Sequence, residues 1–225
     1  MTASFLLLAA PLLAAAGDGH HHGHAKNAHG AHGNPADLDA YIAKMVEPGR
    51  DEWQKPDEVV KALGISPGQV VCDIGAGPGY FSLRLAKAVG ESGGVFAVDV
   101  ESKILEALRV RIEASGARNV TPVLALPDAP LLPAGTCDLV LVVDTYHHFP
   151  DGPAYLRQLA RVLKPGGRIA NIDFHKRELP VGPPLDHKVS EADFRRDAKA
   201  AGLDVVSAPA FLPHQYFLVM KPRAD

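Results

Sequence analysis

The sequence predicts an α/β fold with an open, mostly parallel sheet, and three observations support this prediction. Residues 70–74 form a short, almost wholly apolar run of β-prone residues, as a central parallel strand requires. The run breaks into a glycine-rich turn at residues 75–79, and residues 82–89 then carry apolar side chains at helical spacing. A second apolar run at residues 94–98 ends at Asp99. This order places the turn at the carboxyl edge of a sheet, where open α/β folds bind ligands.

Further motifs narrow the choice among protein families that share this fold class. The turn has the spacing GxGxG and follows an acid, Asp73, by two residues, whereas a dinucleotide-binding turn would have GxGxxG. Asp99 stands at the position of a ribose-binding acid, and residues 163–167 read Leu-Lys-Pro-Gly-Gly. Together these motifs resemble those of the class I S-adenosylmethionine-dependent methyltransferases, in particular the small-molecule, type 11-like group. The resemblance covers residues from about 65 to the C-terminus.

The resemblance implies a Rossmann-like three-layer sandwich around a seven-stranded, mostly parallel sheet. The implied strand order is 3-2-1-4-5-7-6, with the last strand antiparallel. Periodicity and turn residues place the other elements along the chain. We expect helices at 37–46, 56–63, 102–115, 153–163 and 190–201, and strands at 120–124, 137–143, 168–172, 203–207 and 215–220. Pro122 suits an edge strand, because proline cannot donate to a ladder.

The resemblance also implies a role for each residue near the first two strands. Gly75, Ala76, Gly77 and Gly79 would approach the methionine portion and ribose of S-adenosylmethionine, with backbone donors available to its carboxylate. Asp73 would attract the α-ammonium group, and Asp99 would accept hydrogen bonds from both ribose hydroxyls. Val100 would lie against the adenine.

The adenine end departs from the family pattern. Similar enzymes often place Gly-Asp just after the third strand, but this chain reads Ala-Leu-Pro-Asp-Ala at residues 125–129. Two interpretations of Asp128 stay open. It replaces the usual acid from a position two residues away, or it is an ordinary loop acid and the contact is lost.

The segment after the fourth strand, residues 144–151, resembles the acceptor loop of small-molecule methyltransferases. Asp144, Tyr146, His147 and His148 are its candidate catalytic residues. His148 or His147 could serve as a general base near neutral pH, and Tyr146 could pack on the acceptor. The alternative for His148 is a structural hydrogen bond beneath the loop.

Two other groups could contribute to this edge. His175, His187, His147, Asp144 and Asp173 would converge if the loops fold over it, which gives a minor hypothesis of a divalent ion. Arg50, Trp53 and Gln54 precede the first strand and either line the cofactor pocket or, for Trp53, simply fasten a helix to the domain.

We expect the methyltransferase domain at residues 37–225, and the residues before it to lie outside the domain. Residues 1–16 are apolar and end in three alanines, which is typical of a signal peptide, although no positive region precedes them. A misassigned start is the alternative, so we expect a periplasmic or secreted protein if the leader is cleaved and a cytoplasmic one otherwise. Residues 17–36 are rich in histidine and read as a linker that either binds Zn²⁺, Ni²⁺ or Cu²⁺ loosely or is merely solvated.

Composition limits the partners. The net charge is −3, so we expect a small-molecule acceptor and no nucleic acid, and no apolar run is long enough for a transmembrane span. Cys72 and Cys137 are expected to lie at different heights in two strands, without a disulfide. Two competing hypotheses are an NAD-linked oxidoreductase, which the GxGxG spacing disfavours, and a non-catalytic exported binding module that keeps the fold.

Overall fold

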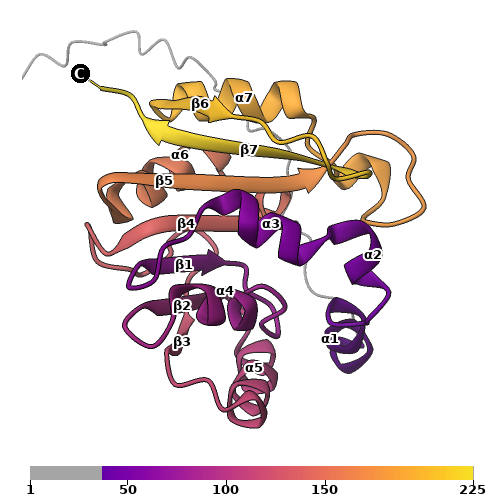
Figure 1. Cartoon of the computed structure of the whole chain (residues 1–225). Helices are drawn as coiled ribbons and strands as arrows, with labels where there is room; N and C mark the ends of the chain where they lie inside the picture. The colour runs from indigo at the N-terminus through magenta and orange to yellow at the C-terminus, as the bar shows by residue number, and fades with distance from the viewer. Residues whose placement is uncertain (1–36, 225) are drawn as a thin grey trace, which may run out of the picture.

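A seven-stranded sheet in the order β3-β2-β1-β4-β5-β7-β6 runs through residues 37–224, the part of the chain that this computed structural model describes (Figure 1). The strands are β1 (Val70–Ile74), β2 (Gly94–Asp99), β3 (Val120–Leu124), β4 (Cys137–Val143), β5 (Leu163–Phe174), β6 (Leu203–Ser207) and β7 (Gln215–Pro222). The first five strands pair in parallel, and β7 is antiparallel to both β5 and β6. The predicted fold class, strand order and edge position of the third strand are therefore confirmed.

Helices cover both faces of the sheet, which makes the three layers. On one face lie α3 (Pro56–Leu63), α4 (Ser82–Val89) and α5 (Ser102–Ser115), and on the other α6 (Gly152–Val162) and α7 (Glu191–Ala200). Leu85 of α4 and Leu108 of α5 are fully buried against the first face, as Leu156 and Phe194 are against the second. Because both faces are covered, the central strands are mostly apolar on both sides, as the sequence indicated.

Two short helices, α1 (Leu38–Met45) and α2 (Arg50–Gln54), precede the sheet. Asp37 caps α1 through a hydrogen bond from the Ala40 amide (3.0 Å), which explains why that helix begins there. Figure 1 shows both helices beyond the carboxyl ends of β1 and β5. They therefore lie at the ligand-binding edge of the sheet, together with the short 3₁₀ turns η1 (Tyr146–His148) and η2 (Leu185–His187).

Strand β5 is longer than predicted, because it begins at Leu163 rather than at Arg168. The Lys-Pro-Gly-Gly segment that reads as a turn continues the strand, and the pairing of β4 with β5 shifts register between Cys137 and Leu139. Such an irregularity absorbs residues that a regular ladder could not.

The expectation of no disulfide was wrong, since Cys72 of β1 and Cys137 of β4 are bonded, with Cα atoms 6.0 Å apart. In a regular strand, Cys137 would face the same side as Leu139 and Leu141, which is opposite to Cys72. Instead, Cys137 joins the same core cluster as Cys72, because β4 loses its strict alternation near Cys137. The prediction assumed regular strands and so missed the contact.

Within residues 37–224, the structure has no helix with both the length and the apolar character needed to cross a bilayer. The predicted leader (residues 1–16) and histidine-rich linker (residues 17–36) lie outside the described residues.

Candidate functional site at the carboxyl edge of the sheet

The glycine-rich turn is held tightly between the ends of β2 and β4. Gly75 and Gly77 have positive φ angles of +70° and +56°, which side-chain-bearing residues rarely adopt. A Cβ atom on Gly75 would overlap the Thr145 side chain, and one on Gly77 would lie 3.2 Å from the Met45 sulfur of α1. The glycines therefore let the β1 turn, the loop after β4 and α1 approach one another closely.

The turn uses its own backbone donors internally. The amides of Gly75 and Ala76 both donate to the Val98 carbonyl (2.8 and 3.0 Å), and the Gly79 amide donates to the Ala76 carbonyl (3.1 Å). The Gly77 amide donates to the Asp99 carboxylate (2.9 Å). The expectation that these donors are available to a ligand carboxylate is therefore corrected, because each has a partner inside the protein.

Two buried acids flank this turn. The Asp73 carboxylate accepts a hydrogen bond from the Ser82 hydroxyl (2.6 Å), while Asp99 accepts from the amides of Gly77 and Glu101 (2.9 and 3.1 Å). Burial raises the pKa of Asp73 to about 6, although the Ser82 hydroxyl opposes that effect. Burial also raises the pKa of Asp99 against its backbone donors. The site thus holds two carboxylates that would gain from a cation or a hydroxyl donor.

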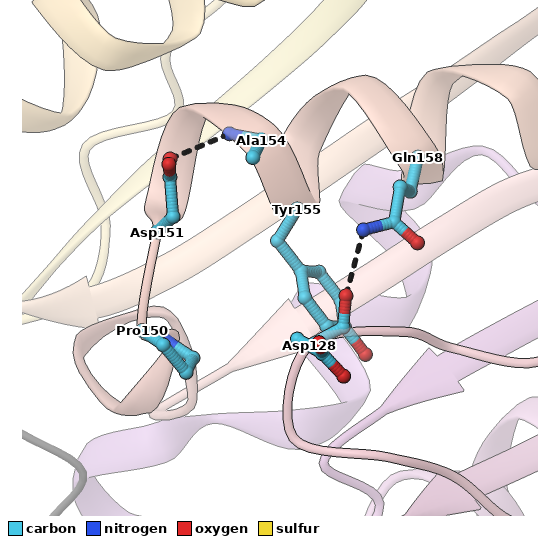
Figure 2. Close-up of a pocket in the computed structure, with 6 residues that line it drawn as sticks. All are labelled: Asp128, Pro150, Asp151, Ala154, Tyr155 and Gln158. Atoms are coloured by element: carbon cyan, nitrogen blue, oxygen red, sulfur yellow. Dashed lines mark hydrogen bonds between the residues drawn. The ribbon is translucent and has the colours of Figure 1, made fainter.

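An apolar and partly open corner adjoins Asp99. Val100 is 51% exposed at the end of β2, and Leu126 in the loop after β3 is exposed to the same extent. A cavity of about 260 Å³ lies where that loop meets α6, lined by Asp128, Pro150, Asp151, Ala154, Tyr155 and Gln158. In Figure 2, the Asp128 backbone carbonyl accepts a hydrogen bond from Gln158 (2.7 Å), and the Tyr155 ring lies beside it.

The carboxylates of Asp128 and Asp99 both affect the pKa of Tyr155. Burial raises the pKa of Tyr155 first, and the carboxylates of Asp128 and Asp99 raise it further. Asp128 and Asp99 therefore both lie within electrostatic reach of Tyr155.

The loop after β4 carries the predicted acceptor residues, and it begins with a strained one. Asp144 has a φ angle of +52° and its amide donates to the Ile172 carbonyl (2.9 Å). Non-glycine residues in this region are uncommon and gather at functional sites. Burial raises the pKa of Asp144 to about 7 against the opposing effect of the Arg50 guanidinium.

His147 is buried and paired with Asp173 at the end of β5. Its Nδ1 lies 3.2 and 3.3 Å from the two Asp173 carboxylate oxygens. Burial lowers the pKa of His147, but the charge and hydrogen bond of Asp173 outweigh burial, so the pKa is raised above its ordinary value. His148 is half-buried, and its ring lies against that of His147 with centroids 4.2 Å apart.

Tyr146 does not reach this group. Its ring is 2% exposed, its hydroxyl donates to Asp197 of α7 (2.9 Å), and it packs edge-on against Phe149 and Phe194. The Tyr146 side chain therefore packs in the core and is not part of the proposed site.

Helix α2 supplies three residues whose roles the sequence left open. Arg50 of α2 contacts Asp144, and the buried Gln54 donates to Gln215 of β7 (2.6 Å), which in turn donates to Asp144. Trp53 packs against Phe174 with ring centroids 5.6 Å apart, so it fastens α2 to the end of β5. Gln215 was missed altogether, since a glutamine at the start of a strand has no local signal.

The comparisons with known proteins agree with this geometry. Residues 71–167 match a family model described as a methyltransferase domain. A solved S-adenosylmethionine-dependent methyltransferase from Aquifex aeolicus is 29% identical, with a TM-score of 0.77, and the match covers 80% of this chain and 96% of that one. Residues 71–167 thus carry a methyltransferase domain, and the chain has the fold of the class I S-adenosylmethionine-dependent methyltransferases.

Curated relatives of this chain share only part of their length with it. Two ubiquinone/menaquinone biosynthesis C-methyltransferases UbiE are similar: one from Haemophilus ducreyi (29% identity, 74% of this chain) and one from Vibrio vulnificus (35% identity, 59% of this chain). The chain spans 63% and 50% of those relatives' lengths.

No metal-binding group emerges from the part of the chain that the structure describes. Within residues 37–224, no three or more His, Cys, Asp or Glu side chains are placed to hold an ion. The five residues of the divalent-ion hypothesis do not form such a group. His175 instead lines a shallow cavity of about 250 Å³ with Lys176, Arg177 and Ser190.

Proposed function

We propose that this chain binds S-adenosylmethionine at the carboxyl edge of β1 and β2 and transfers its methyl group to a small-molecule acceptor. When bound, the cofactor supplies an electrophilic methyl group on a sulfonium centre for SN2 attack. The observation that carries the proposal is the buried Asp99 carboxylate, which is fixed by the Gly77 amide beside the exposed Val100. A hydroxyl-accepting acid next to an apolar surface suits a ribose and its attached adenine.

The other residues have matching roles in this proposal. Asp73 offers a buried carboxylate to the cofactor's ammonium group, and the turn that contains Gly75 and Gly77 would lie beside the methionine portion. Asp128 would meet the adenine from the cavity beside Tyr155. The family match supports the cofactor, while these individual roles rest on position and chemistry.

We infer that His147 removes the proton of the acceptor, with Asp173 as the positioning residue. The Asp173 carboxylate accepts a hydrogen bond from Nδ1–H of the ring, which leaves Nε2 as the proton acceptor. Asp173 raises the pKa of His147 above the ordinary histidine value, which makes Nε2 a stronger base. Asp144 and His148 are neighbours that tune or support this pair.

The acceptor is not carried over from the relatives. The two UbiE proteins are named C-methyltransferases, but this chain covers only part of their length. We propose a small organic acceptor with an ionisable O–H, N–H or C–H group, since a base is available and the net charge of −3 gives no basic surface for nucleic acid. The comparisons lend no support to a non-catalytic binding module.

Calorimetric titration of the full chain with S-adenosylmethionine and S-adenosylhomocysteine tests the proposal. We expect micromolar binding of both ligands, and we expect Asp99→Ala to abolish it. A folded sample that binds neither ligand would overturn the cofactor assignment. Binding by Asp99→Ala at the parent's affinity would instead overturn the placement of the site. Confirmed binding then justifies an acceptor screen with a labelled methyl donor.

A further inference from the structure

The carboxyl edge is dominated by negative charge, and one arginine lies within it. Asp73, Asp99 and Asp144 all belong to this edge, and the pKa of Tyr41 on α1 is raised by burial and then by Asp144 and Asp99. The Arg50 guanidinium opposes these effects, since it lowers the pKa values of Asp73, Asp144 and Tyr41. Arg50 therefore lies within electrostatic reach of all three groups.

The cofactor has one part that this acidic edge does not suit. The methionine portion carries a carboxylate, and a carboxylate needs a cation or several N–H donors when water is excluded. The glycine-rich part of the turn is poorly placed to supply them, because the amides of Gly75, Ala76, Gly77 and Gly79 are all bonded within the protein. A charged side chain from another element is the stronger donor.

A closed ring of hydrogen bonds fixes the Arg50 side chain. Arg50 Nε donates to Gln54 (2.9 Å), and Gln54 donates to Gln215 (2.6 Å). Gln215 then donates to one oxygen of Asp144, and Arg50 Nη2 donates to the other (3.3 Å). The flat face of the guanidinium lies over the Tyr80 ring, 4.1 Å from its centroid. Three hydrogen-bonded side chains, from α2, the loop after β4 and β7, together with the Tyr80 ring, therefore preorganise one cation.

This arrangement leaves Arg50 with donors to spare. An arginine has five N–H groups, and three are used: one by Gln54, one by Asp144 and one by the Met45 carbonyl (2.8 Å). One N–H remains on each terminal nitrogen. The contact to Asp144 is also longer than the 2.7–2.9 Å that is usual for a charge-assisted pair. The guanidinium thus has unused capacity for a second carboxylate.

We propose that Arg50 binds the carboxylate of the methionine portion of S-adenosylmethionine, held in place by Gln54, Gln215 and Asp144. The inference rests on the proposed function, since it assigns one further contact within the same cofactor site. It makes the N-terminal helix α2 part of the cofactor site, because Arg50 belongs to that helix.

The parent protein alone provides a first test. Its affinity for S-adenosylmethionine is compared with that for decarboxylated S-adenosylmethionine, which keeps the ammonium and sulfonium charges and lacks only the carboxylate. Hydrogen bonds to charged groups predict about 10- to 100-fold weaker binding of the decarboxylated ligand. Equal or tighter binding of that ligand would overturn the inference. Failure to bind either ligand would overturn the proposed function instead.

Variants then assign the effect to Arg50. We expect Arg50→Gln to bind S-adenosylmethionine about 10- to 100-fold more weakly and the decarboxylated ligand within about 3-fold of the parent. Arg84→Gln is the matched control, because Arg84 also lies over the Tyr80 ring (4.5 Å) but pairs with Asp51 on the outer side. It should leave both affinities within about 3-fold of the parent. Equal losses for both ligands in Arg50→Gln would show a structural role and sink the proposal.

Discussion

Asp73 is a buried carboxylate whose ionisation works against folding. Burial raises its pKa to about 6 from an ordinary value near 4, so the unfolded chain loses this proton at a lower pH than the folded protein does. The folded state therefore loses stability relative to the unfolded state as pH rises from about 4 to about 6, and the penalty is complete above that window. A buried charge is retained here because, in our proposal, it meets the ammonium group of the cofactor.

Asp73→Asn should remove this penalty while keeping an oxygen for the Ser82 hydroxyl. The difference in free energy of unfolding between variant and parent should be more favourable to the variant at pH 7.5 than at pH 4, by up to about 3 kcal/mol. Denaturant titrations of parent and variant at both pH values measure the difference. The variant should also bind S-adenosylmethionine more weakly.

Asp138→Asn is the control with the opposite sign. Burial acts to raise the pKa of Asp138, but the Lys164 side chain and the Val70 amide lower it more, so its net pKa is depressed. Its contribution to stability is present above the unfolded pKa and is lost in acid. The control should therefore be destabilised at neutral pH. A gain in both variants, or in neither, would contradict the assignment.

The His147–Asp173 pair gives a second prediction at the level of single residues. The folded pKa of His147 lies above its ordinary value because of Asp173, so the stability that the pair provides is present below about pH 6.5 and is lost as pH rises through the folded pKa. Asp173→Asn should lower the His147 pKa by at least one unit, as followed by NMR titration of the ring protons. Asp186→Asn, beside the half-exposed His187, is the control, and it should leave the His147 resonance unmoved. An unchanged His147 pKa in Asp173→Asn would contradict the pairing.

Secondary-structure elements are joined here by one covalent link between central strands. The Cys72–Cys137 disulfide connects β1 to β4 and closes a loop with a sequence separation of 65 residues. A cross-link of this span removes conformational freedom mainly from the unfolded chain. It lies beneath the glycine-rich turn and the acceptor loop, which continue from these two strands.

We expect the double variant Cys72→Ala, Cys137→Ala to lose about 2–4 kcal/mol in free energy of unfolding. Chemical denaturation with and without a reductant provides the measurement and its control. The reductant should destabilise the parent and leave the double variant unchanged. A parent that shows two titratable thiols after unfolding without reductant would refute the disulfide.

At the scale of the whole molecule, the N-terminal helices pack against the carboxyl edge of the sheet, where we propose that the cofactor binds. Tyr41 and Met45 of α1 lie at the glycine-rich turn and the acids, while Arg50 of α2 reaches the end of β4. Lys103 of α5 also pairs with Asp39 of α1 (2.9 Å), although exposed pairs of this kind contribute little. Residues far before the first strand are therefore part of the ligand-binding edge.

Two truncated chains separate the contribution of helix α1 from that of residues 1–36. A chain that begins at Asp37 keeps every contact described above, so it should match the full chain in melting temperature and in affinity for S-adenosylmethionine. A chain that begins at Glu47 lacks α1 and should bind the cofactor at least about 10-fold more weakly, by calorimetry. Equal affinity of the two truncated chains would show that α1 takes no part in the site.

Local sequence determined most of the architecture because its signals are short-ranged. Apolar runs, the glycine spacing and the helix caps lie within a few residues of one another, and they predicted the seven strands and the positions of Asp73 and Asp99. The loop after β4 was likewise located from the sequence, and its role as the acceptor loop stays a prediction. The direction of Tyr146 into the core was not predicted, since it depends on Asp197, 51 residues away.

The sequence by itself determined the fold and the resemblance to a family, and it predicted the edge of the sheet at which we propose that a ligand binds. Only the tertiary structure decided which side chains meet there. The ring that holds Arg50 joins residues separated by 94 and by 161 positions, and the disulfide depends on an irregularity in β4. Such contacts follow from register and packing between distant segments, which no local pattern of residues encodes.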